Sequence, residues 1–88
     1  MQYMIIEKFR PGKVKELYKR FEEKGRQLPE GLTYINSWIN EDVTLCYQLM
    51  ETEHIDKIHE WIEHWIDVAE FEIVKVISSA EAKRKVGV

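Results

Sequence analysis

Four short runs rich in β-branched and aromatic residues constrain the fold of this chain more than any other feature. They lie at residues 3–9, 32–39, 43–50 and 71–77 and are typical of strands. Between the first two runs, apolar side chains recur on one helical face, at Val14, Leu17, Tyr18 and Phe21. A second amphipathic segment separates the last two runs, so the predicted order is strand, helix, strand, strand, helix, strand.

Breaks between these segments support the same boundaries. Pro11-Gly12 ends the first strand, and Asn40-Glu41-Asp42 has the composition of a hairpin turn. Thr52 is a predicted N-cap for the second helix, which we expect to run to about Val68. Residues 78–81, Ser-Ser-Ala-Glu, resemble a capping box, so a short C-terminal helix is expected after the fourth strand.

This order is the split βαβ arrangement of a ferredoxin-like α+β fold, with a four-stranded antiparallel sheet and two helices on one face. The 88 residues suffice for one domain, which we place at residues 1–82, followed by a charged C-terminal tail at 83–88. A domain this small buries little surface, so association with a second copy would stabilise it.

Both faces of the predicted sheet are apolar, although the helices cover only one. In the first strand, for example, Tyr3 and Ile5 alternate with Met4 and Ile6. An uncovered apolar sheet face is an interaction surface, and a second copy related by a two-fold axis is its simplest cover. The sequence therefore predicts a homodimer packed sheet face to sheet face. The alternative is that the C-terminal tail folds over the face.

Composition argues against several classes of protein. The net charge of −3 does not suit a nucleic-acid binder, and no apolar run is long enough to span a membrane. Cys46 is the only cysteine, which suits a reducing cytoplasm, and the N-terminus lacks the pattern of a signal peptide. No glycine-rich phosphate loop or other cofactor motif is present, so we expect no cofactor.

The segment from Leu49 to Asp67 holds all three histidines and two of the three tryptophans. At about 100° per residue, His54 falls inside the apolar sector of the helix, whereas His59 and His64 lie on different flanks. The three therefore cannot converge on one metal, and no metal site is expected. His54 is either a structural histidine or a general acid or base at the rim of a pocket.

Other candidates are polar side chains embedded in apolar strands and the aromatic side chains of the second helix. The embedded residues are Glu7, Asn36, Gln48 and Cys46. They form either cross-strand hydrogen bonds or the polar lining of a ligand cavity. Cys46 itself is expected to be a small buried hydrophobe rather than a reactive thiol. Trp61 and Trp65 have the spacing of core residues, with ligand stacking as the alternative.

Several motifs together resemble a known family. They are Phe9-Arg10-Pro11-Gly12, Leu28-Pro29-Glu30-Gly31, Trp38 at the end of the second strand, Glu51-Thr52-Glu53, the Trp61 and Trp65 pair, and Phe71-Glu72-Ile73-Val74. The chain up to Ala82 resembles a family of small uncharacterised ferredoxin-like proteins within the dimeric α+β barrel superfamily. The resemblance implies two sheets packed face to face, in agreement with the apolar pattern.

The same resemblance implies a range of activities rather than one. Members of this superfamily include cofactor-free monooxygenases, chlorite-handling haem enzymes, isomerases and ligand sensors. No superfamily catalytic residue, a proximal haem histidine included, has a matching position in this chain.

We therefore expect a homodimer that binds a small, partly apolar ligand or acts as a cofactor-independent enzyme. Its pocket would lie between the sheet and the helices or within the dimeric barrel. Six residues are predicted to line it: Asn36, Trp38, Gln48, Glu51, His54 and Trp65. Only His54 is a catalytic candidate. The alternative function is a non-catalytic structural or regulatory interaction module.

Overall fold

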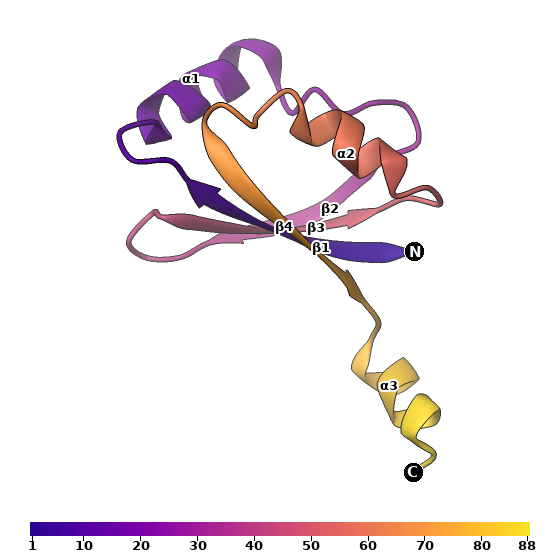
Figure 1. The fold of residues 1–88 in the computed structure, drawn as a ribbon. Coiled ribbons are helices and arrows are strands. Elements are labelled where there is room, and N and C mark those ends of the chain that lie inside the picture. Colours follow the sequence, from indigo (N-terminus) through magenta and orange to yellow (C-terminus); the bar gives the residue numbers. More distant parts are fainter.

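Four strands form one antiparallel sheet in the order β2-β3-β1-β4 (Figure 1). The computed structural model describes residues 1–88. The strands are β1 (Gln2–Phe9), β2 (Thr33–Ile39), β3 (Leu45–Glu51) and β4 (Ala69–Val76). The helices are α1 (Val14–Lys24), α2 (Asp56–Ile62) and α3 (Ser79–Val86). This βαββαβα order confirms the predicted antiparallel α+β architecture and is consistent with a ferredoxin-like fold.

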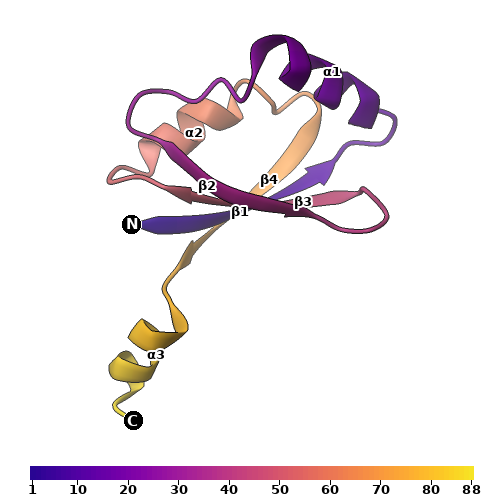
Figure 2. The ribbon, with the colours of Figure 1, turned by 180° about the vertical axis from the view of Figure 1, so that it is seen from behind.

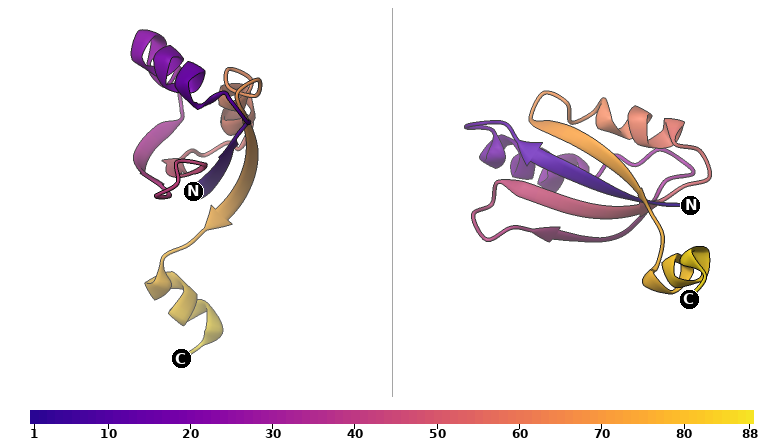
Figure 3. Two further views of the ribbon diagram at one scale, coloured as in Figure 1. Left: turned by 90° about the vertical axis from the view of Figure 1, so that its left-hand side faces the viewer. Right: turned by 60° about the horizontal axis from the view of Figure 1, so that its bottom comes forward.

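Helices α1 and α2 lie on one face of the sheet, and the opposite face has no helix packed on it (Figures 1 and 2). Helix α3 follows β4 and projects away from the sheet (Figure 3). It therefore does not cover the open face, which was the alternative to a second copy. None of the helices is long and apolar enough to cross a lipid bilayer.

The main core lies between α2 and the sheet. Tyr3 and Ile5 from β1 and Met50 from β3 point to this side, because alternate strand residues face opposite ways. Ile58, Trp61 and Ile62 of α2 pack on them in one cluster of buried apolar side chains. Trp61 and Phe71 meet edge to face, with ring centroids 5.7 Å apart.

The open face of the sheet is largely apolar, as predicted, and also carries Lys8, Glu70 and Glu72. Its members alternate with the buried core residues along each strand. They include Met4, Ile6, Leu45, Tyr47, Leu49, Val74 and Trp38. The Trp38 side chain is 51% exposed.

A β-bulge between Tyr34 and Asn36 changes one expectation about β2. Simple alternation would place Tyr34 and Trp38 on the same face. The shift in register instead pairs Tyr34 with Met50 on the helix side and Trp38 with Tyr47 on the open side.

The hairpin between β2 and β3 forms at the predicted turn, and its first residue holds it together. The Asn40 side-chain oxygen accepts hydrogen bonds from the backbone N–H groups of Thr44 and Leu45 at 2.8 and 2.9 Å. Val43 lies in this turn with φ 57°, not in β3, so the strand begins two residues later than expected. A positive φ cannot continue a strand.

Helix α2 is shorter than the sequence pattern predicted. It begins at Asp56 rather than next to Thr52, whose hydroxyl instead accepts a hydrogen bond from the His54 N–H at 3.2 Å. It ends at Ile62, and the chain continues to Val68 through turns. These turns still point Trp65 and Val68 into the core. The predicted burial of these residues is therefore correct, although they do not belong to a helix.

The C-terminal helix was predicted correctly. The Ser78 side chain accepts a hydrogen bond from the Glu81 N–H at 3.1 Å, as a capping box requires. Gly87 ends the helix in the left-handed conformation, at φ 81°.

Candidate functional site

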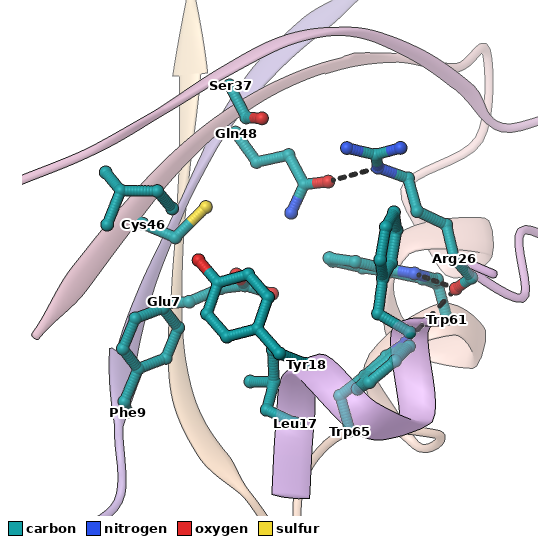
Figure 4. Close-up of a pocket in the computed structure, with 12 residues that line it drawn as sticks. Glu7, Phe9, Leu17, Tyr18, Arg26, Ser37, Cys46, Gln48, Trp61 and Trp65 are labelled. Atoms are coloured by element: carbon teal, nitrogen blue, oxygen red, sulfur yellow. Dashed lines mark hydrogen bonds between the residues drawn. The ribbon is translucent and has the colours of Figure 1, made fainter. Parts of the chain in front are cut away.

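A cavity of about 260 Å³ lies between α1 and the sheet (Figure 4). Side chains from β1, β2, β3 and α1, from the loop after α1, and from the α2 region line it. Eight of the 12 lining residues are hydrophobic. The full set is Glu7, Phe9, Leu17, Tyr18, Phe21, Arg26, Ser37, Ile39, Cys46, Gln48, Trp61 and Trp65. This cavity is the candidate functional site.

The cavity exists because α1 does not close on the sheet. No residue of α1 is buried, although the helix has a clear apolar stripe. Tyr18 is 42% exposed and Phe21 is 37% exposed, and both face the cavity. Large rings on this helix therefore form a wall instead of filling the space beneath it.

A polar clamp ties α1 to the segment after α2. The Arg20 guanidinium donates to both carboxylate oxygens of Asp67, at 2.8 and 2.7 Å, and to the His64 carbonyl at 2.9 Å. It also lies over the Trp65 ring, 5.6 Å from the centroid. The bidentate Arg20 bond lowers the pKa of Asp67 to about 2. These polar contacts, together with the packing of Val14 and Leu17 on the buried clusters, position α1.

Glu7 is the most unusual group in the cavity. Its residue is only 7% exposed, and strand alternation points its side chain to the helix side between Ile5 and Phe9. Burial raises the pKa of Glu7 to about 7, an effect that a hydrogen bond from Cys46 and the positive charge of Arg26 only partly offset. The carboxyl group can therefore hold or release a proton near neutral pH.

Cys46 is the cross-strand partner of Glu7. Burial raises the pKa of its thiol to about 12, and the charge of Glu7 and the hydrogen bond to it add to this. The group stays a thiol and donates its hydrogen. Cys46 is thus a buried small residue, as predicted.

Tyr18 brings a phenol to the same side of the cavity as Glu7 and Cys46 (Figure 4). Burial raises the pKa of Tyr18, as do the nearby groups of Cys46 and Glu7. The phenol therefore stays protonated and able to donate a hydrogen bond to a ligand.

Arg26 supplies a positive charge at the side of the cavity opposite Glu7, Cys46 and Tyr18 (Figure 4). Its Nε donates to the Gln48 side-chain oxygen at 3.1 Å. Its guanidinium lies 3.5 Å from the ring centroid of Tyr34 and 4.9 Å from that of Phe21. Arg26 takes part in no ion pair within the protein.

Two tryptophans fix the backbone of this arginine. The indole N–H groups of Trp61 and Trp65 both donate to the Arg26 carbonyl, at 2.9 and 3.1 Å (Figure 4). The next residue, Gln27, has φ 60°, a conformation that is uncommon for residues other than glycine. The loop after α1 is therefore held in one defined shape by the core beneath α2.

The cavity brings together two of the six predicted site residues, Gln48 and Trp65. Asn36 and Trp38 lie on the open face because of the β2 bulge. Glu51 and His54 are exposed and do not line the cavity. The expectation that His54 turns inward was wrong. It assumed a helix that includes residue 54, whereas α2 starts at Asp56.

Some cavity residues had a signal in the sequence and others did not. Glu7 and Cys46 stand out as polar or thiol groups within apolar strands. Tyr18 and Phe21 belong to the α1 stripe, which reads like any core-facing stripe. Arg26 follows Gly25 in a loop, and nothing in the sequence marks it as facing a cavity.

Comparisons with known proteins identify a family but no activity. The profile of DUF3303, a domain of unknown function, matches residues 1–87. The chain belongs to the DUF3303 family. A search of curated proteins and a search of solved structures each found no match. This membership agrees with the resemblance to small uncharacterised proteins noted from the motifs.

Proposed function

We propose that this DUF3303 domain binds a small, partly apolar molecule in the cavity beneath α1 and exchanges a proton with it through Glu7. The observation that carries the proposal is a carboxyl group with a pKa of about 7 that lines an apolar cavity. A perturbed carboxyl in a pocket marks a candidate general acid or base.

The surrounding groups suit a cofactor-independent proton transfer. As a carboxylate, Glu7 accepts a proton from an acidic C–H or O–H of the ligand, and as the neutral acid it donates one. The Tyr18 phenol is the nearby hydrogen-bond donor, and the Gln48 side chain is oriented by Arg26. Apolar walls lower the local dielectric and strengthen each polar contact with the ligand.

A thermal-shift screen against small aromatic and alicyclic molecules tests the binding step. A ligand that binds only the folded state raises the melting temperature. Glu7→Gln keeps the size of the side chain and removes the acid, so ligands should still bind while any proton exchange is lost. Exchange of ligand C–H protons into deuterated water, followed by NMR, measures that step. A flat screen across the panel would contradict the proposal.

For the assembly, we propose that a second copy covers the open sheet face, giving the dimeric α+β barrel. The supporting observation is the largely apolar open face, with Trp38 51% exposed at its β2 side. Helix α3 leaves this face free (Figure 3). Exposed apolar areas of this kind mark interfaces in small proteins.

Sedimentation of a matched pair of variants tests the dimer. Trp38→Glu places a charge on the open face and should give monomer at micromolar concentration. Ile55→Glu changes another exposed apolar residue, 40% exposed at the start of α2, and should leave the dimer intact. A wild-type monomer would contradict the assembly, and would leave the cavity proposal standing because the cavity lies on the other face.

A further inference from the structure

Resting on the proposed cavity, we propose that its ligand is a small organic monocarboxylate with an apolar, single-ring body. The carboxylate binds the Arg26 guanidinium, and the body extends across the apolar walls toward Glu7. Three features of the site carry this assignment: the free donors of Arg26, the way that residue is held, and the charge distribution in the cavity.

The Arg26 guanidinium has hydrogen-bond donors that no protein group uses. Its Nε–H is used by Gln48, and neither terminal nitrogen donates a hydrogen bond within the protein. No buried side-chain nitrogen or oxygen lacks a partner, so these terminal donors face solvent or the cavity. Their planar fork matches the two oxygens of a carboxylate and forms charge-assisted hydrogen bonds with them.

The arginine is preorganised for this contact. Gln48 orients one edge of the guanidinium, and the Tyr34 and Phe21 rings lie close to it. Trp61 and Trp65 hold its carbonyl from below. Little side-chain or backbone freedom remains to be lost when an anion binds, which favours affinity.

The charge distribution selects a single negative charge. No carboxylate of the protein pairs with Arg26, and Glu7 lies across the cavity without forming an ion pair with it. The other walls are mostly apolar, so a second charge on the ligand would be buried without a partner. At about 260 Å³ the cavity is below the range of drug-sized pockets, roughly 300–1,000 Å³, and suits one ring with a short acid arm.

Binding of an anion should also change the protonation of Glu7. The positive charge of Arg26 lowers the pKa of Glu7. A carboxylate on Arg26 neutralises that charge, so Glu7 takes up a proton when the ligand binds near neutral pH. This uptake is a second readout of the same geometry.

Isothermal titration calorimetry with 3-phenylpropionate and its uncharged amide tests the inference. Wild type should bind the acid at least about tenfold more tightly than the amide. Arg26→Gln should remove this preference, and Arg26→Lys should keep part of it. Lys24→Gln, an exposed residue at the end of α1, is the matched control and should behave as wild type. Titrations in buffers of different ionisation enthalpy measure the proton uptake, which Glu7→Gln should abolish.

The outcomes separate this inference from the proposed function. Equal binding of acid and amide, or an unchanged preference in a folded Arg26→Gln protein, overturns the carboxylate assignment and leaves a ligand cavity. If Lys24→Gln also loses the preference for the acid, general surface charge explains that preference, and the carboxylate assignment is overturned as well. If neither compound binds at millimolar concentration, the carboxylate assignment fails, and a flat thermal-shift screen would then remove the cavity proposal too.

Discussion

Helices α1 and α2 cover the same face of the sheet, but only α2 packs closely on it. Helix α2 buries Ile58, Trp61 and Ile62, whereas α1 buries no residue. Both helices have an apolar stripe, so the helices themselves do not explain the difference. It lies in the strand residues beneath them.

Beneath α2, the sheet presents Tyr3, Ile5 and Met50, which are apolar or aromatic and buried. Toward α1, the same two strands present Glu7 and Cys46, which are cross-strand partners. Glu7 is already only 7% exposed, and closer packing of α1 would remove the remaining space for a ligand or water beside its carboxyl group, at a cost of a few kcal/mol. The polar end of the sheet therefore favours a cavity, and the apolar end favours a core.

Truncation of the α2 core should have the largest effect on stability. Trp61 is 2% exposed and donates a hydrogen bond to the Arg26 carbonyl. Trp61→Ala should lower the free energy of unfolding by about 3–5 kcal/mol, because it leaves a cavity in a packed core. Urea denaturation followed by circular dichroism measures this change. A loss below about 1 kcal/mol would mean that α2 is no better packed than α1.

Glu7 should make the stability depend on pH. Its pKa is about 7 in the folded protein and 4.5 without the protein environment, so the folded state binds protons more tightly. The contribution of Glu7 to stability should be greatest below about pH 4.5, fall as the pH rises to about 7, and then level off, a loss of about 3 kcal/mol.

Urea denaturation at a series of pH values checks this dependence. Glu7→Gln should remove the change in stability between about pH 4.5 and 7. Above about pH 7 the variant should be more stable than wild type. Glu22→Gln, an exposed change on α1, should keep the wild-type slope. Equal slopes for wild type and Glu7→Gln would show that Glu7 is not buried as the structure places it.

Removal of the clamp between α1 and the segment after α2 should lower stability less than the changes above. Arg20 and Asp67 are partly exposed, so Arg20→Ala should cost about 1 kcal/mol or less at low salt, and less still at high salt. Hydrogen exchange should become faster in α1 and stay unchanged in α2. Lys19→Ala, a neighbouring residue outside the ion pairs, is the control. Unchanged exchange in α1 would indicate that apolar contacts alone hold the helix.

Truncation of a side chain in the cavity wall should have the smallest effect on stability. Phe21 is 37% exposed, so Phe21→Ala should change the free energy of unfolding by less than about 1 kcal/mol. The same change removes a ring beside Arg26 and should weaken 3-phenylpropionate binding about tenfold. Calorimetry and urea denaturation of one preparation give both values. A large loss of stability would place α1 in the core.

Prediction from sequence worked where local chemistry decides the structure. The turn at Asn40, the cap at Ser78 and the order of strands and helices were all correct. Prediction failed where one element depends on another. The β2 bulge put Tyr34 and Trp38 on opposite faces of the sheet, and the late start of α2 left His54 exposed. Neither the bulge nor the late helix start has a strong local signal.

The sequence alone determined the strands, the helical stripes and the apolar character of both sheet faces, because these follow from the spacing of side chains along the chain. Only the tertiary structure decided which buried polar groups meet. Glu7 and Arg26 are far apart in sequence, and the antiparallel pairing and the loop after α1 bring them to one cavity. Only the tertiary structure shows that α1 buries no residue, so that a cavity, not a core, lies beneath it.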